Sequence, residues 1–299
     1  MTGVVHHHDA FEGERSRLVG LAYRITGSRT EADDIVQDAW VRWNGADRSA
    51  VDRPAAWLTT VTSRLALDRL KSARHRRETY VGPWLPEPTT LAPGPAEQAE
   101  LAESLTIGFL AVLERLSPVE RVVFLLADVF SVPFADIALA VDKSPDACRQ
   151  IASRARRRVR DEQPRFTPTD DEAWQVTVAF LAAAQQGDTK TLVDLLADGA
   201  LATSDGGPHQ RAARRPIVAD RIPRFVVNLT RRGLAPDDEV IPVSLNGQPG
   251  VAVRRHGRTT LALALAVSRG QVDRVWTILN PTKLDALDAE LADRDGAPT

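Results

Sequence analysis

The sequence predicts a multidomain chain in which two all-α helical domains precede an α+β domain. Apolar residues recur at helical spacing through residues 11–77 and 96–162, as they do in helices that bury one face. After residue 239 the pattern changes to alternation with a period of two, which is typical of strands. The length of 299 residues is sufficient for two or three domains.

Two breaks in this pattern predict the domain boundaries. Residues 81–98 contain five prolines. Because each proline fixes φ and removes a backbone donor, we expect a semi-rigid, extended linker there. A shorter linker is expected at residues 164–171. The predicted domains are therefore 1–80, 99–163 and 172–299.

The first domain is expected to contain three helices, at residues 11–25, 30–44 and 54–77. Gly27 ends the first helix. Thr30 is followed by an acidic residue three positions later, which resembles a capping box. The third helix begins with a proline, which the first turn of a helix tolerates.

The second domain is expected to contain four helices, at residues 96–116, 119–128, 134–141 and 145–162. Two Ser-Pro pairs, at 117–118 and 144–145, each place an N-cap residue before a proline. The last two helices and the short turn between them form the pattern of a helix-turn-helix.

In the third domain, helices are predicted at residues 172–186, 189–197 and 217–232, and strands at 241–245, 261–267 and 272–279. Asn246-Gly247 follows the first strand and is a strong signal for a tight hairpin. Elements of this kind are typical of an α+β domain with helices packed on a curved sheet.

Charge is unevenly distributed along the chain. Residues 64–77 contain six basic residues and one acidic residue, and residues 143–165 contain eight basic and three acidic residues. Residues 172–299 are balanced, with fifteen of each sign. This asymmetry predicts a polyanionic partner for the first half of the chain only.

The second helix of a helix-turn-helix enters the major groove of DNA. Here the residues expected at the DNA are Ser144, Asp146, Arg149, Gln150, Ser153, Arg154 and Arg157. Arg149 suits guanine and Gln150 suits adenine, whereas Arg157 would contact phosphates. The alternative is an ordinary helical hairpin with a solvated basic end.

Two helices of the first domain also combine features that suit binding. The helix at 54–77 carries aromatic and basic residues, which suit unstacked bases of single-stranded DNA. The helix at 31–43 is acidic on one side and apolar, with two tryptophans, on the other. Its apolar face can pack inside the domain or dock a partner, and the residues alone favour core packing for Trp40. For the helix at 54–77, the alternative is an ordinary charged surface helix.

Residues 31–43, 54–77 and 116–160 resemble, in order and spacing, the conserved regions of extracytoplasmic-function sigma factors of bacterial RNA polymerase. The resemblance implies sigma region 2 for the first domain, sigma region 4 for the second, and core RNA polymerase and promoter DNA as partners. The residues implied to contact the polymerase are Asp34, Ile35, Val36, Gln37, Asp38 and Trp40. Those implied to melt and read the minus-ten element are Arg53, Trp57, Arg64, Arg69, Lys71 and Arg74. The helix-turn-helix is implied to read the minus-thirty-five element.

The third domain resembles the cone-shaped SnoaL-like domain that is fused to one subgroup of these sigma factors. The subgroup's linker motif is intact as Trp84-Leu85-Pro86-Glu87-Pro88. Its Asp-Gly-Gly-Gly-Lys motif appears as Asp205-Gly206-Gly207-Pro208-His209, and its Asn-Pro-Asp-Lys-Leu motif as Asn280-Pro281-Thr282-Lys283-Leu284. The resemblance implies that these residues regulate the protein and that no separate anti-sigma factor is required.

The sequence predicts neither an enzyme nor a cofactor. Asp205, His209, His256 and Asp273 are the acid–base candidates of the third domain, and nothing in their spacing pairs them. No metal site is expected, because no carboxylate or cysteine stands at ligand spacing from the histidines at 6–8. The single cysteine, Cys148, excludes an internal disulfide and suits a small buried position.

Two alternatives to a sigma factor stay open at this stage. A one-component regulator would bind a small ligand in its C-terminal domain without contacting the polymerase, and a bifunctional protein would carry an enzyme there. The sequence contains no apolar run of the ~20 residues that cross a bilayer, so a cytoplasmic protein without a membrane partner is expected.

Overall fold

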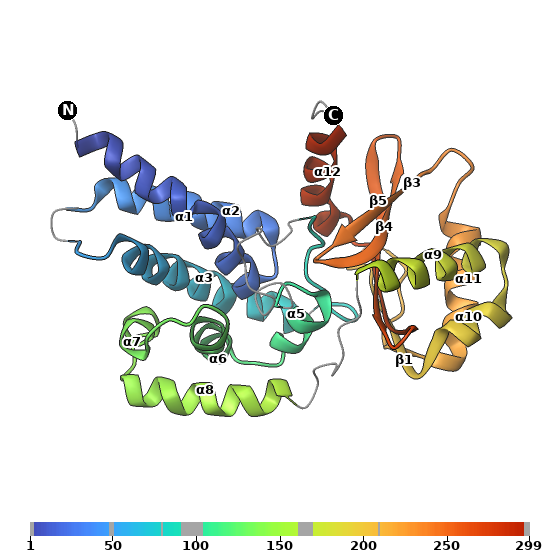
Figure 1. The fold of residues 1–299 in the computed structure, drawn as a ribbon, viewed down its shortest axis with the longest axis horizontal. Helices are drawn as coiled ribbons and strands as arrows, with labels where there is room; N and C mark the ends of the chain where they lie inside the picture. The colour runs from blue at the N-terminus through green and yellow to red at the C-terminus, as the bar shows by residue number, and fades with distance from the viewer. Residues whose placement is uncertain are drawn as a thin grey trace. The chain divides into compact units, whose positions relative to one another are not determined.

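The computed structural model describes residues 3–47, 51–78, 80–90, 104–160, 170–208 and 210–295 (Figure 1). The chain forms two compact units. The first comprises Met1–Thr79, Gln98–Ser104 and Phe109–Gln163, and the second comprises Tyr80–Glu97, Leu105–Gly108 and Pro164–Thr299. Across the described ranges, no helix is both long and apolar enough to span a membrane.

The first unit begins with three helices, as predicted: α1 (Gly3–Thr26), α2 (Arg29–Gly45) and α3 (Pro54–Glu78). The residue that caps α2 is Ser28 and not Thr30, because Ser28 is extended and its hydroxyl accepts from the Glu31 amide at 3.1 Å. The histidines at 6–8 lie within α1, which therefore begins well before the predicted residue 11.

The second set of helices in this unit is α5 (Ile107–Leu113), α6 (Pro118–Phe124), the π-helix η2 (Leu125–Val129), α7 (Phe134–Val141) and α8 (Pro145–Arg160). Ser117 and Glu120 form a capping box at the start of α6. Of the helix predicted at 96–116, residues 96–103 lie outside the described ranges. In the described part, only Ile107–Leu113 is helical, and residues 104–106 and 114–116 form turns and bends, so the predicted helix was too long.

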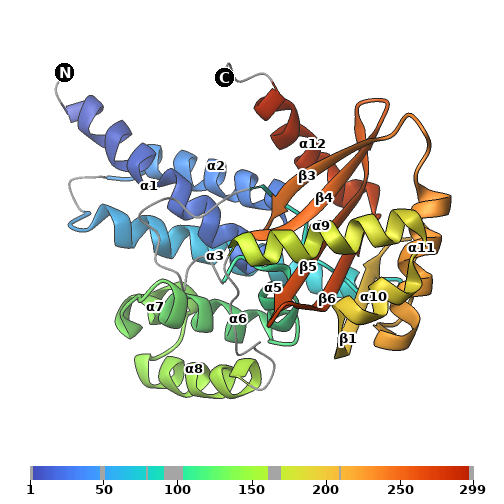
Figure 2. The same ribbon diagram turned by 45° about the vertical axis from the view of Figure 1, so that its right-hand side comes forward.

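Within the first unit, the two sets of helices pack against each other. α3 contacts both α6 and α7, and Figures 1 and 2 show these three helices side by side. The buried Arg121 guanidinium of α6 donates to the Arg24 carbonyl at the end of α1, at 3.1 and 3.2 Å. Because the last carbonyls of a helix lack helical partners, this contact satisfies one of them.

The second unit is an α+β domain, as predicted. Its helices are α9 (Asp170–Gln186), α10 (Thr189–Leu195), η3 (Ala219–Arg221), α11 (Ile222–Gly233) and α12 (Pro281–Asp295). Its strands are β1 (Leu196–Asp205), β2 (Ile217–Val218), β3 (Glu239–Leu245), β4 (Gln248–Arg255), β5 (Arg258–Ser268) and β6 (Gln271–Ile278). They form one sheet in the order β2-β1-β6-β5-β4-β3, in which only the β1–β6 pair is parallel.

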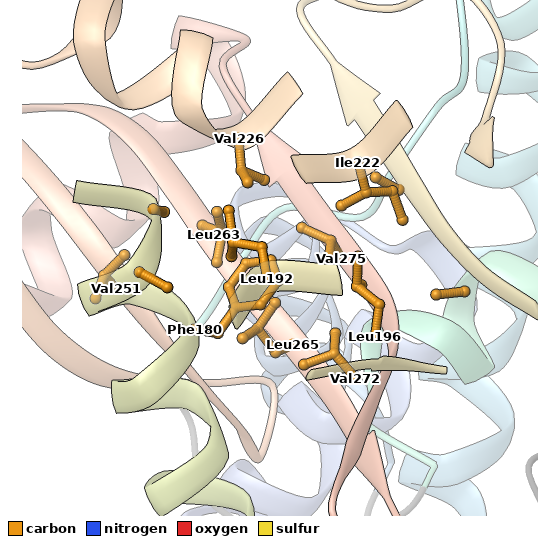
Figure 3. Close-up of a cluster of buried hydrophobic side chains, with 14 of the residues drawn as sticks. Phe180, Leu192, Leu196, Ile222, Val226, Val251, Leu263, Leu265, Val272 and Val275 are labelled. Carbon is orange, nitrogen blue, oxygen red and sulfur yellow. The ribbon is translucent and has the colours of Figure 1, made fainter. Parts of the chain in front are cut away.

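Both faces of this sheet are buried. On one face, Phe180 of α9, Leu192 of α10 and Val226 of α11 pack against Leu263 and Leu265 of β5 (Figure 3). The opposite face packs against α12 and, on β5, consists of alanines at positions 262 and 264. The period-two pattern of β5 is therefore an alternation between large and small apolar residues, not between apolar and polar ones.

Three elements of the second unit differ from the sequence prediction. The helix predicted at 189–197 ends at Leu195, and the chain continues directly as β1, whose aspartates, glycine and alanines are poor strand formers. Residues 217–221, predicted as helix, form an edge strand and a short 3-10 turn before α11. The sequence analysis did not predict α12.

Candidate DNA-binding surfaces and a buried polar cluster

The residues predicted to face DNA share one exposed side of α8. The left-handed Asp142 (φ 54°) makes the tight turn after α7, and the Ser144 hydroxyl caps α8 by accepting from the Ala147 amide at 3.2 Å. The exposed residues of this face are Asp146, Arg149, Gln150, Ser153, Arg154 and Arg157. Cys148, predicted to be buried, is 0% exposed on the opposite side, and burial raises the pKa of its thiol.

Arg149 is held in place by two neighbours. Its guanidinium forms an ion pair with Asp146, and it lies 5.6 Å from the centroid of the Phe134 ring. Asp146 was expected to meet a base edge, but in the free protein its carboxylate is occupied by Arg149. The surface that α8 offers is therefore an oriented arginine flanked by free polar side chains.

Not all arginines of α8 are available to phosphates. Arg156 pairs with Asp128 at 2.7 Å, and Arg158 pairs with Glu120 at 2.9 Å. Burial raises the pKa of Glu120, but hydrogen bonds from Ser117 and the charge of Arg158 lower it overall. Arg157 is exposed and forms no ion pair with any described residue, so its guanidinium is available to a phosphate.

The residues predicted to read the minus-ten element are not all presented together on α3. The Arg53 guanidinium pairs with Asp136 of α7 at 2.6 Å, and the Arg64 guanidinium donates to the Leu139 carbonyl at 2.6 and 3.0 Å. Trp57 packs on Trp43 inside the helical bundle, with ring centroids 5.4 Å apart. The two arginines are thus engaged by the first helix of the helix-turn-helix.

The remaining residues predicted to read the minus-ten element are Lys71, Arg69 and Arg74. Lys71 is exposed and lies 3.7 Å from the Asp68 carboxylate, and Arg69 is half-buried. The side chain of Arg74 lies outside the described residues.

The predicted polymerase-contact residues of α2 divide into exposed and buried ones. Asp34, Gln37 and Asp38 are exposed. Ile35 and Val36 are 1% and 2% exposed and belong to the core. Trp40 is half-buried, and its ring packs on Phe11 with centroids 4.8 Å apart, so it lies at the edge of the core. Val41, which the sequence analysis did not single out, is 63% exposed and adds an apolar contact to the acidic face.

The second unit contains a buried polar cluster centred on Asp205, at the end of β1. The Asp205 carboxylate accepts from the Tyr80 hydroxyl at 2.5 Å and from the Leu85 amide at 2.8 Å. It also pairs with the Lys283 ammonium at 2.7 Å. The side chains of Asp205 and Lys283 are 0% and 7% exposed. A buried charge needs both a partner and hydrogen bonds, and the cluster supplies them.

Lys283 and Tyr80 join the linker to this cluster. The Lys283 ammonium donates to the Leu85 carbonyl and lies 3.9 Å from the centroid of the Trp84 ring. The Tyr80 hydroxyl accepts from the Asn280 amide group at 2.7 Å. Burial, and then the hydrogen bond and charge of Asp205, raise the pKa of Tyr80, so the phenol stays protonated and donates.

The two glycines after Asp205 are required by close packing. A Cβ on Gly206 would lie 2.6 Å from the Gln210 carbonyl oxygen. A Cβ on Gly207, whose φ is 60°, would lie 2.6 Å from the Asn280 side chain. Pro208, the first position that departs from the subgroup motif, is exposed, and His209 lies outside the described residues. The first departure therefore leaves the cluster intact.

The linker is part of the second unit and not a free spacer. Leu85 is 2% exposed and packs in the core beside α12. The Thr90 amide donates to Glu290 of α12 at 2.6 Å. Pro86 and Pro88 are buried, whereas Glu87 is half-buried. Residues 81–90, the described part of the predicted linker, contain no helix or strand, and residues 91–98 lie outside the described ranges. The proline content could not show what this segment packs against.

Asn246 binds the chain on both sides of residues 91–103. This residue of the β3–β4 turn is 0% exposed. Its backbone amide donates to the Thr89 carbonyl at 2.8 Å, and its side-chain amide donates to the Leu105 carbonyl at 3.0 Å. The Ile107 amide donates to Gln248 of the next strand at 3.0 Å. The C-terminal unit thus fixes both ends of the connection between the two helical domains.

Two of the acid–base candidates of the third domain, Asp205 and His256, lie in different parts of the fold. The Asp205 carboxylate accepts from the Leu85 amide of the linker, and His256 lies in the turn between β4 and β5. The face of the sheet that packs against α9, α10 and α11 is filled with apolar side chains (Figure 3). Across the described ranges, no group of three potential metal ligands comes together.

Comparisons with known proteins agree with this geometry. Residues 10–76 match the family model for sigma-70 region 2, and residues 108–159 match the model for sigma-70 region 4. The ECF RNA polymerase sigma factor SigJ of Mycobacterium tuberculosis (strain H37Rv) is 40% identical, over 97% of this chain and 96% of its own length.

Two further comparisons extend this result. The probable ECF RNA polymerase sigma factor SigI of the same strain is 32% identical, over 94% of this chain and 96% of its own length. The crystal structure of SigJ matches with a TM-score of 0.71 and 37% identity, and the match covers 91% of this chain and 96% of that chain.

Proposed function

Because this chain belongs to the extracytoplasmic-function sigma factors of RNA polymerase, we propose that it binds core polymerase and directs it to promoters with minus-ten and minus-thirty-five elements. It is a transcription initiation factor and not an enzyme. The observation that carries the promoter assignment is the exposed, arginine-bearing face of α8. A one-component regulator without polymerase contact would not need the acidic face of α2. We place this activity in the cytoplasm, where promoter DNA is found.

The roles of Arg149 and Arg157 are separable in a DNA-binding experiment. Arg149→Ala is expected to reduce discrimination between the cognate and a mutated minus-thirty-five element by about 1–3 kcal/mol, because it removes a base contact. Arg157→Ala is expected to weaken binding to all sequences and to lower the salt slope by about one. The measurement is a titration of polymerase holoenzyme on both promoters at several salt concentrations. Equal losses on cognate and random DNA for both variants would contradict the assignment.

We propose further that the free protein holds part of its minus-ten surface closed. Arg53 and Arg64 are bound to α7 through Asp136 and the Leu139 carbonyl. Both contacts are exposed and therefore weak, of the order of 1 kcal/mol or less each. Binding to the polymerase can break them at low cost, and the two arginines would then face DNA.

The variant Asp136→Lys tests this closed contact. Replacing the attraction to Arg53 by repulsion is expected to raise the affinity of the free chain for a single-stranded minus-ten oligonucleotide severalfold, as measured by fluorescence anisotropy. The control is Glu12→Lys, which makes the same charge change on an exposed part of α1. An equal gain for both variants would show a general charge effect and would refute the closed contact.

The C-terminal domain is proposed to regulate initiation by holding the linker. This proposal is supported by the contacts of Asp205, Lys283 and Asn246 with the linker residues. Because the same chain carries both the helical domains and the C-terminal domain that binds the linker, we propose that no separate anti-sigma factor is required. A small ligand in the C-terminal domain is the second candidate regulator. It would have to displace apolar side chains from between the sheet and the helices α9, α10 and α11.

Truncation tests both parts of this proposal. In run-off transcription with core polymerase, the full chain is expected to initiate at a promoter with both elements. A chain ending at Leu279 lacks Asn280, Lys283 and α12, and a chain ending at Glu162 lacks the whole domain. Both truncations are expected to change the promoter output without abolishing it. Unchanged output in both would refute regulation by the linker contacts, and no output from the full chain would refute the sigma-factor role.

A further inference from the structure

A strongly basic segment lies in the domain whose overall charge is balanced. Residues 172–299 contain fifteen basic and fifteen acidic residues, but seven of the basic ones and only one acidic one, Asp220, fall within residues 211–232. The basic residues are Arg211, Arg214, Arg215, Arg221, Arg224, Arg231 and Arg232, and all seven are exposed. The charge balance of the domain therefore conceals a local excess of positive charge.

The second half of this segment forms a continuous stripe on α11. Counting at 3.6 residues per turn, Arg221, Arg224, Asn228, Arg231 and Arg232 lie on one side of the helix. The opposite side carries Ile222 and Val226, which are 0% and 2% exposed and pack in the core. Figures 1 and 2 show α11 beside α10 at the edge of this unit. The stripe is about 15 Å long, at 1.5 Å per residue.

Among the residues that the structure describes, no carboxylate pairs with the stripe. Its four arginines form no ion pair with any described residue. By contrast, Arg255 pairs with Asp238 at 2.7 Å, and this pair holds the pKa of Asp238 at about 2. Asp220 and Asp237 are the exposed acids nearest in sequence. Arg221 and Arg224, three positions apart, repel each other weakly. Arg231 and Arg232 lie in the last turn of α11, where the helix dipole favours positive charge. The fold therefore tolerates the stripe, and a polyanion can bind it.

We propose that this face of α11 binds the phosphates of DNA, so that the C-terminal domain makes its own contact with the template. The proposal rests on the proposed function, which brings the chain to promoter DNA. Arginine suits this role because its planar guanidinium binds phosphate through paired hydrogen bonds. The stripe carries no aromatic side chain on which a base would stack, so the contact is to the backbone and is independent of sequence.

A charge-reversal variant tests the stripe. Arg224→Glu combined with Arg231→Glu is expected to lower the affinity of holoenzyme for promoter DNA severalfold and to reduce the salt slope by about two. The control combines Lys190→Glu and Arg269→Glu, which are exposed positions of the same unit outside the stripe. This control has the same net charge, so it is expected to change the slope much less. Equal slopes for the two double variants would overturn the proposal.

A cross-linking experiment identifies the partner directly. Asn228→Cys places a thiol in the middle of the stripe, and the native Cys148 is buried and unreactive by comparison. A photoreactive group on this thiol is expected to cross-link to duplex DNA in the promoter complex. The yield of cross-linked DNA is expected to fall as the salt concentration is raised. Cross-linking to a polymerase subunit only, or to nothing, would overturn the proposal. Run-off transcription by the same complex tests the sigma-factor role separately, because a complex that initiates without a DNA adduct refutes only the α11 contact.

Discussion

Replacing Lys283 by methionine is expected to lower the free energy of unfolding of the C-terminal unit by about 3–5 kcal/mol, the usual cost of leaving a buried charge unpaired. The Asp205 carboxylate would keep its hydrogen bonds from Tyr80 and Leu85, but its side chain is 0% exposed and would lose its only cation among the described residues. Urea denaturation of the full chain, followed by tryptophan fluorescence, measures the change. Trp84 and Trp276 of this unit report on it directly.

The matched control is Lys190→Met, which makes the same substitution at an exposed lysine of α10 and is expected to change stability by less than about 0.5 kcal/mol. The Lys283 variant is also expected to release the linker, because its ammonium donates to the Leu85 carbonyl. Faster hydrogen exchange at the Leu85 amide would show this release. A Lys283→Met chain within about 1 kcal/mol of the wild type would contradict the account of the cluster.

Replacing Asp34 by lysine is expected to weaken the binding of core polymerase about thirtyfold or more. Asp34 is exposed on the acidic face of α2, beside Asp38 and the exposed Val41. If this face docks a basic surface of the polymerase, charge reversal replaces an attraction by a repulsion, and the loss of a desolvated interface charge pair costs about 2–5 kcal/mol. Competition for core polymerase against a labelled wild-type chain measures the change.

The fold of the first unit is expected to survive this substitution, because Asp34 contributes nothing to the buried face of α2 that carries Ile35 and Trp43. Glu12→Lys on α1 is the control for net charge and is expected to bind normally. Loss of binding in both variants would indicate a nonspecific charge effect. Normal binding by the Asp34 variant would contradict the assignment of this face to the polymerase.

The helices of the first unit were predictable because their signals are local. The prolines at the start of α3, α6 and α8, the serine N-caps of α6 and α8, and the glycine after α1 all act within a few residues of the helix end. The helical periodicity also placed the residues of α8 that are predicted to face DNA on one side. The capping of α2 was predicted two residues too late, because Thr30 and Ser28 both have hydroxyls and only the observed backbone of Ser28 is extended.

The contacts through which we propose that the C-terminal domain regulates initiation were not predictable in this way. The cluster around Asp205 joins Tyr80, Leu85 and Lys283, which are separated from it by 78 to 125 residues. The motifs singled out these segments, but no periodicity or cap shows that they meet. The same is true of Arg53 and Asp136, which are 83 residues apart. β1 was missed because its pairing with β6 outweighs its weak strand propensity.

The most direct test of the sigma-factor assignment is complex formation between the purified full chain and core RNA polymerase. At low ionic strength, the account predicts that the two co-elute in size-exclusion chromatography as a stoichiometric complex and that this complex protects both promoter elements from nuclease. Separate elution of the chain and the core enzyme under these conditions would contradict it.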